Sequence, residues 1–258
     1  MGMGHSRKLI LAGVAFGALV VPAVAADPLT VRPPDATTTW TRCYVGVTAG
    51  GAKGQSDVSW APLPAGFAGG VGPTIAAKTL ASIDSTGFTG GGEGGCNYQT
   101  NSWFVVGLEG DLEYTGLNGT NSGYGVRPGN TFTETFSSNW LSTVRVRAGI
   151  ASGRWLFFAT GGWAIANVSF SDSIFFPFSN TTNAASSSGT VTGWTVGGGA
   201  EWAFAPRWSV KAEYLYVDLD TTSFASINSN PVQFPHASIV HSHSLTENVG
   251  RFGVNYRF

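Results

Sequence analysis

Large apolar residues occupy every second position along much of this chain. Between Phe252 and Phe258 each second residue is large and apolar, and the residues between them are Gly253, Asn255 and Arg257. Successive side chains of a β-strand point to opposite faces, so this period of two predicts a strand with one apolar and one polar face. No stretch beyond the first 26 residues approaches the roughly 18 consecutive apolar residues of a membrane-spanning helix.

The same alternation predicts eight strands in all. Connections after the second, fourth and sixth are a few residues long, whereas the other connections are roughly 20–35 residues of Gly, Ser, Thr, Asn and Pro. This layout is typical of an outer-membrane barrel, so the predicted fold is all-β, an eight-stranded antiparallel transmembrane up-and-down β-barrel. The segment 154–170 is strand-like, but its phase is ambiguous. The predicted strands lie near residues 42–51, 86–99, 103–115, 139–152, 154–170, 190–205, 207–221 and 246–258.

Three observations favour an apolar face that points outward to lipid. The interior of an eight-stranded barrel holds only side chains or one small ligand, so large aromatic residues would overfill it. Aromatic residues cluster near the strand ends, as in the interfacial girdles of membrane barrels. Only 11% of the residues are charged, whereas a soluble domain carries about 25% and needs that charge on its outside.

Composition adds two further points. The 36 glycines among 258 residues are about twice the usual share, and small residues suit a narrow barrel interior. The formal net charge is −1, so the chain has no basic excess with which to bind nucleic acid.

The N-terminus has the pattern of a secretory signal peptide. Arg7 and Lys8 precede the apolar run Leu9 to Val21, and small residues follow as far as Ala26. A charged start, a short apolar stretch and an A-x-A-like end predict export, with cleavage after Ala25 or Ala26. The predicted organisation is a signal peptide at residues 1–26, a Pro-containing periplasmic linker at 27–39 and a barrel at 40–258 in the outer membrane of a Gram-negative bacterium.

Five parts of the chain carry a resemblance to a known family, namely Trp40–Gly46, Gly87–Gly92, Arg154–Gly162, Trp208–Tyr216 and the terminal Phe258. The first four look like the first, second, fifth and seventh strands of the small eight-stranded outer-membrane barrels of alphaproteobacteria, a surface-antigen or opacity-like "porin family" group. The resemblance runs from Trp40 to Phe258 and is most specific in the seventh strand and at the C-terminal end. The resemblance implies outer-membrane lipids and lipopolysaccharide as surroundings. It also implies that the assembly machinery of the outer membrane reads the terminal aromatic residue Phe258.

The phase of the strands directs a set of charged side chains into the barrel. Six acids and four bases in a narrow interior must largely pair, because an unpaired buried charge is costly. Neighbouring carboxylates can also act as a general acid and a general base in catalysis. Because a filled interior admits no substrate, we predict no catalytic residue. A narrow ion path along the charges is the alternative. Arg257 is a further candidate beside these ten, which are Glu93, Glu109, Asp111, Glu113, Arg145, Arg147, Glu201, Lys211, Glu213 and Arg251.

The two cysteines have two interpretations. Cys43 and Cys96 fall on the outward face of adjacent predicted strands, where they would be small lipid-facing side chains or, in an oxidising compartment, a disulfide. In the resembled family an aromatic residue is usual at both positions. The register that would decide between the two is not visible in the sequence.

Three histidines fall in the last predicted long loop, namely His236, His241 and His243. The spacing His241-x-His243 could bind Zn²⁺ or Cu²⁺, with Glu247 the nearest carboxylate in sequence. With Ser242 or Ser244 the same histidines could suggest a lipid hydrolase, although adjacency in sequence does not make a triad. We interpret the segment as a polar loop and predict neither a metal nor a cofactor.

Together these features predict a non-enzymatic outer-membrane barrel with a structural and surface role. Its long loops would contact the environment or a host. The alternatives are a narrow passive pore for ions or small solutes and, third, a lipid-modifying enzyme.

Overall fold

The chain is described from a computed structural model, which covers residues 39–62, 81–124, 129–233 and 238–258. The predicted signal peptide and all but the last residue of the predicted linker lie outside these ranges, as do His236 and the cleavage site. No helix among the described residues is long and apolar enough to span a membrane. The strands are β1 (Arg42–Pro62), β2 (Ala81–Gln99), β3 (Phe104–Tyr124), β4 (Thr131–Ser152), β5 (Trp155–Phe176), β6 (Thr181–Ala205), β7 (Trp208–Ala225), β8 (Ile227–Asn228) and β9 (Ile239–Arg257).

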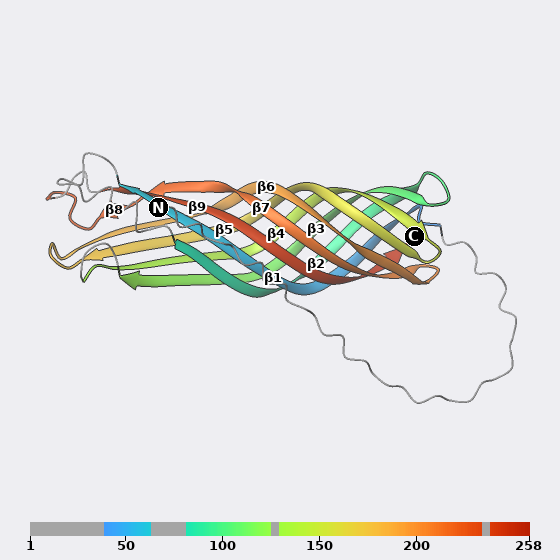
Figure 1. Ribbon diagram of the computed structural model, residues 1–258, viewed down its shortest axis with the longest axis horizontal. Helices are drawn as coiled ribbons and strands as arrows, with labels where there is room; N and C mark the ends of the chain where they lie inside the picture. The colour runs from blue at the N-terminus through green and yellow to red at the C-terminus, as the bar shows by residue number, and fades with distance from the viewer. Residues whose placement is uncertain (1–38, 63–80, 125–128, 234–237) are drawn as a thin grey trace, which may run out of the picture. The chain divides into compact units, whose positions relative to one another are not determined.

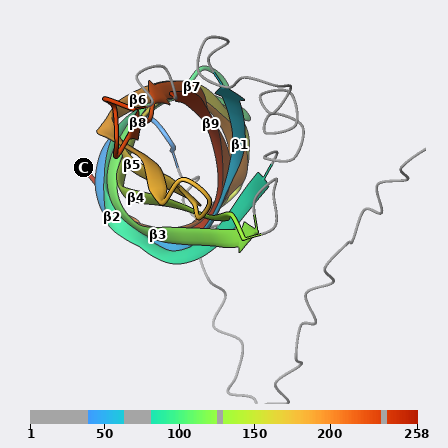
Figure 2. The same ribbon diagram turned by 90° about the vertical axis from the view of Figure 1, so that its left-hand side faces the viewer.

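Eight long strands form a closed antiparallel barrel. Neighbours in sequence pair from β1 to β7, β7 pairs with β9, and β9 returns to pair with β1. The two-residue β8 adds to the rim of β6. The strands run tilted along the barrel, and the view along its axis shows the ring (Figure 1, Figure 2). The predicted eight-stranded all-β barrel is confirmed.

The strands are longer than the sequence pattern predicted, and this corrects the loop assignment. The fifth predicted connection, from residue 171 to 189, is mostly strand, because β5 continues to Phe176 and β6 begins at Thr181. Similarly, β4 begins at Thr131 rather than near residue 139, and β9 begins at Ile239 rather than near residue 246. Short turns follow β2, β4 and β6 at the end of the barrel where the C-terminus lies (Figure 1).

The reason for the difference is that the polar and apolar faces exchange along each strand. In the first part of β5 the outward residues Phe157 and Trp163 are exposed aromatics. From residue 167 to residue 173 the outward residues are Asn167, Ser169, Ser171 and Ser173, while the inward ones are buried and mainly apolar. A strand that is apolar outside in one half and apolar inside in the other shows both phases, which explains the ambiguity at 154–170.

The exchange divides the barrel into two halves. In the half near the short turns, which we call the lower half, large apolar side chains such as Val146, Leu108 and Phe252 are exposed, as contact with lipid requires. In the other, upper half, the outward wall is polar and the interior is an apolar core, the arrangement of a barrel surrounded by water. This core contains Trp60, Ile83, Leu117, Phe136, Leu141, Val168, Phe170, Ile174, Leu215, Val217, Leu219, Leu245 and Val249, among others.

Neighbouring glycines show how narrow the interior is. A Cβ atom built on the inward Gly162 would lie 2.0 Å from the carbonyl oxygen of Val144, a clash with backbone that cannot move aside. On the outward Gly161 the nearest atom would be the Thr195 carbonyl oxygen at 3.5 Å, an ordinary contact. The excess of glycine therefore serves in part to let neighbouring strands curve closely around the lumen.

Candidate functional site

All ten predicted lumen charges lie inside the lower half, where at most 6% of each residue is exposed. They come from β2, β3, β4, β6, β7 and β9, so the site exists only once the barrel is closed. Because strand residues alternate, a single phase along each strand directs all of them to the same space. We call these ten residues the lumen network.

Arg145 lies at the centre of the lumen network. Its guanidinium bonds Glu109 at 2.5 Å, Asp111 at 2.8 Å and Glu213 at 2.8 Å. Arg251 bonds a second set at its own end, with Glu113 at 2.5 Å and Glu213 at 2.6 Å. Planar guanidinium groups suit this arrangement, because one side chain can donate to several carboxylates at fixed angles.

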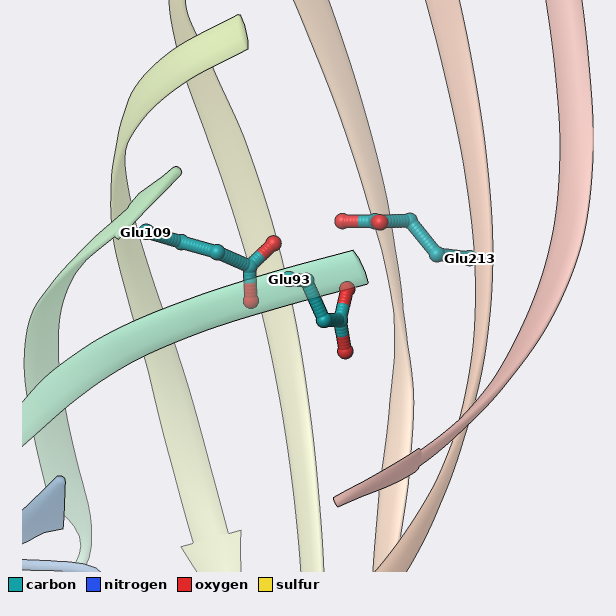
Figure 3. Close-up of side chains that lie close together, drawn as sticks. All are labelled: Glu93, Glu109 and Glu213. Atoms are coloured by element: carbon teal, nitrogen blue, oxygen red, sulfur yellow. The ribbon is translucent and has the colours of Figure 1, made fainter. Parts of the chain in front are cut away.

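Lys211 occupies the point where three glutamates converge. Figure 3 shows the carboxyl groups of Glu93, Glu109 and Glu213 pointing toward one another, as ligands of a metal ion would. The Lys211 Nζ lies 2.5 Å from Glu93, 3.0 Å from Glu109 and 3.4 Å from Glu213. The ammonium group already supplies the positive charge that these carboxylates require, so we assign no metal to them.

Hydroxyl groups that the sequence reasoning missed complete the lumen network. Tyr44 and Arg147 both bind Glu109, and Arg147 donates to the Tyr44 hydroxyl at 2.8 Å. Thr48 and Thr89 donate to Glu113, at 2.5 and 2.9 Å. These donors help to satisfy the excess of acids over bases, and the inward phase of β1 and β2 was the signal that could have identified them.

Apolar layers lie on either side of the lumen network. Toward the short turns a small cluster contains Trp40, Val105, Ala151, Leu156, Phe158 and Ala203. The Phe158 ring lies 3.9 Å from the Arg147 guanidinium, so this cluster is in direct contact with the charges. Arg257 belongs here rather than to the lumen network, since it stacks on Trp40 and donates to the Ala205 carbonyl. Above the network lies the apolar core of the upper half.

Cys43 and Cys96 form a disulfide. They are register partners on β1 and β2, and the S–S distance is 2.02 Å. Both of the cysteines in the chain are therefore bonded, and the bond lies on the outward face near the short turns.

The segment that contains His241 and His243 is part of a strand and not the predicted polar loop. His241 and His243 lie on β9, where both point inward and are fully buried. Ser242 points outward and bonds Ser223 of β7, so it does not pair with the imidazoles. The loop prediction was wrong because the segment alternates in the exchanged phase of the upper half, with polar residues outside.

The carboxylate that faces both histidines is Asp172 of β5, not Glu247. Its Oδ2 lies 2.7 Å from His243 Nε2 and 2.9 Å from His241 Nδ1. Strands β5 and β9 are not neighbours in the ring, so these contacts cross the lumen. The opposite nitrogen of His243, Nδ1, lies 3.2 Å from the Ser56 hydroxyl of β1. Sequence reasoning missed Asp172 and Ser56 because both lie beyond the predicted strand ends.

Two carboxyl groups near the histidines, those of Glu134 on β4 and Asp172 on β5, have shifted pKa values. Burial raises the pKa of Glu134 to about 7, and the neighbouring charge of Asp172 acts in the same direction. Burial also acts to raise the pKa of Asp172, but the imidazoles of His241 and His243 outweigh it and hold the value below its usual range.

The sequence is similar to those of known outer-membrane proteins. A family model described as "Outer membrane protein beta-barrel domain" matches residues 16–258. The "31 kDa outer-membrane immunogenic protein" of Brucella melitensis and that of Brucella suis are each 30% identical, over 98% of this chain and 100% of the relative. Among solved structures, the outer membrane protein OprG of Pseudomonas aeruginosa aligns with a TM-score of 0.47 and 12% identity, over 87% of this chain and 99% of that one.

Proposed function

The chain belongs to the outer-membrane protein β-barrel family, and we propose that it acts in the bacterial outer membrane as a closed structural barrel that presents a polar surface outside the cell. The observation that carries this proposal is the filling of the lumen. An apolar cluster, the lumen network and an upper apolar core follow one another along the axis, and all three consist of buried side chains.

The filled lumen argues for a structural role over a pore. An ion path needs water or exchangeable polar groups along its length. Here the carboxylates of the lumen network are engaged by guanidinium, ammonium or hydroxyl donors, as at Arg145 and Lys211, and Leu215, Val217 and Leu219 lie in the apolar layer above. Moving a hydrated ion through such a layer is costly.

Conductance in planar bilayers tests the closed lumen. We expect no unitary current steps from the reconstituted barrel, with insertion verified by its different gel mobility before and after boiling. Reproducible current steps from the folded form would contradict a closed barrel and favour the pore.

The upper half supports the surface role. Its outward wall is rich in hydroxyl side chains, among them Ser171, Ser186 and Ser188, which suit water rather than lipid. The Brucella relatives are named as immunogenic proteins, and a polar wall above the membrane is a surface that antibodies could reach.

Labelling of introduced cysteines tests the orientation, since the native disulfide leaves no free thiol to react. In intact cells we expect a membrane-impermeant maleimide to label Ser188→Cys in the upper half. The matched variant Arg207→Cys, in the short turn after β6, should react only after the outer membrane is permeabilised. The reverse pattern would show that the barrel is inverted.

We further propose that the barrel has no catalytic role. The side chains of Ser56, His243 and Asp172 do contact one another in the order of a serine–histidine–aspartate triad. However, Ser56 and His243 are fully buried and Asp172 is 1% exposed. A lipid cannot reach a hydroxyl in that position. The recognition of Phe258 by the assembly machinery, and contact with lipopolysaccharide, stay predictions from the family resemblance.

A further inference from the structure

A groove crosses the outward wall where the two halves of the barrel meet. It has a volume of about 700 Å³ and is lined by residues of β4, β5, β6 and β7. Val144 and Trp163 lie on its side toward the lower half, whereas Ser142, Thr192 and Asp220 lie on its side toward the upper half. The groove is therefore at the level of lipid headgroups, where aromatic and polar side chains meet. The closed lumen makes no use of it.

The groove lies directly below a fork between β6 and β7. The register pairing of these strands ends at Gly193 with Leu219. Above this point β6 pairs with β5 alone until β8 joins its other edge at Ala184, while β7 continues to pair with β9. An unpaired strand edge presents backbone N–H and C=O groups. The top of the groove therefore offers hydrogen-bonding groups of the backbone as well as of side chains.

Two tryptophans lie side by side in the groove. Trp163 and Trp194 are register partners on β5 and β6, and both point outward, with exposed fractions of 76% and 49%. Tyr216 of β7 lies beside Trp194, with ring centroids 5.6 Å apart. The face of an aromatic ring carries negative potential, and the face of an indole attracts cations most strongly.

Two carboxylates of β7 lie beside these rings. Asp218 is the register partner of Trp194, and Asp220 accepts a hydrogen bond from the Thr192 hydroxyl at 2.9 Å. None of the residues that line the groove is basic, and neither carboxylate forms an ion pair with a described residue. Lys53, an exposed base, lies two strands away on β1 and is engaged by an acid of β2. The groove therefore has a negative charge that no described residue compensates.

We propose that this groove binds the ammonium headgroup of a membrane lipid of the choline or ethanolamine type. Its charge selects the lipid, because two carboxylates repel a headgroup of net negative charge, whereas an ammonium group is attracted both by them and by the indole faces. The acyl chains then follow the exposed apolar band below Val144. The site rests on the proposed function, since it requires the apolar band of the lower half to lie in the bilayer.

Lipid retention by the folded barrel tests the site. The barrel is placed in nanodiscs with equal amounts of phosphatidylcholine, phosphatidylethanolamine and phosphatidylglycerol, all with the same acyl chains. Native mass spectrometry then identifies the lipids that stay bound after release. We expect one retained lipid per barrel, with an ammonium lipid favoured over phosphatidylglycerol by about tenfold. No retention, retention without preference, or a preference for phosphatidylglycerol would overturn the proposal.

Variants then locate the lipid. Trp163→Leu and Asp220→Ala should each lower the preference by about fivefold. The matched control Trp155→Leu, an exposed tryptophan on the same face of β5 near the short turns, should behave like the wild type. The gel-mobility shift verifies that each variant folds. A preference that survives both groove variants, or that Trp155→Leu lowers equally, would overturn the site.

This result is independent of the test of the closed barrel. Both faces of a nanodisc carry the same lipids, so retention depends neither on conductance through the lumen nor on the orientation of the barrel in the cell. A barrel that retains no ammonium lipid but conducts no current would contradict the groove alone.

Discussion

Arg145 illustrates what a single residue contributes inside this barrel. It is fully buried and bonds carboxylates from β3 and β7, Glu109 and Asp111 on one strand and Glu213 on the other. Burial makes each of these charges dependent on the others, because water cannot replace a missing partner. The side chain therefore couples strands that do not neighbour one another in the sheet.

We expect Arg145→Ala to lower the free energy of unfolding by about 3–5 kcal/mol, because it leaves buried carboxylates without their partner. Urea unfolding of the barrel refolded in lipid vesicles measures this difference. The control is Lys53→Ala, which breaks an exposed ion pair with Asp84 at 3.4 Å and should cost at most about 1 kcal/mol. Equal, small effects of both substitutions would count against the paired lumen network.

At this scale the phase of alternation was enough to identify the ten charges of the lumen network, since each lies within a strand of clear period two. It was not enough for Asp172, which lies two residues beyond the predicted end of its strand. Nor could it identify contacts such as Asp172 with His243, because a side-chain partner across the lumen depends on closure of the ring.

At the scale of the element, β5 combines a part whose outward face suits lipid with a part whose outward face suits water. Its outward residues are apolar from Trp155 to Ile165 and hydroxylated from Ser169 to Ser173, while the inward ones become apolar over the same upper part. The strand keeps its period of two throughout, and only the surroundings of its two faces change. The alternation alone predicts a loop for the polar part, because one solvent is then assumed for the whole outer face.

A pair of lysine substitutions on the same outward face of β5 tests this division. Ala159→Lys, in the middle of the apolar stretch, should destabilise the barrel by about 2–4 kcal/mol, the cost of a lysine at the bilayer midplane. Ser171→Lys lies on the same face, six residues further along the strand than Ile165, the last residue of the apolar stretch. This substitution should lower the free energy of unfolding by less than about 1 kcal/mol. Unfolding in vesicles compares the two, and similar destabilisation by both would mean that the upper half is also in lipid.

At the scale of the whole molecule, closure depends on the pairing of the first strand with the last. The Cys43–Cys96 bond joins β1 to β2 beside this closing pair and spans 53 residues of the chain. A crosslink over so long a segment stabilises the barrel chiefly by restricting the unfolded chain.

We therefore expect the double substitution of Cys43→Ser and Cys96→Ser to lower the free energy of unfolding by about 2–4 kcal/mol. Reductant should bring the wild type to the stability of this variant and leave the variant itself unchanged. A wild type whose unfolding curve does not respond to reductant would show that the bond is not a determinant of stability.

The sequence by itself determined the strand count, the outward apolar band and the identity of the charges in the lumen network. These follow from local alternation, which depends only on the geometry of an extended chain. The tertiary structure decided the register that bonds Cys43 to Cys96, the exchange of faces in the upper half, and the meeting of Asp172 with two histidines from the far side of the barrel. Those features arise from contacts between strands distant in sequence, which form only when the ring closes.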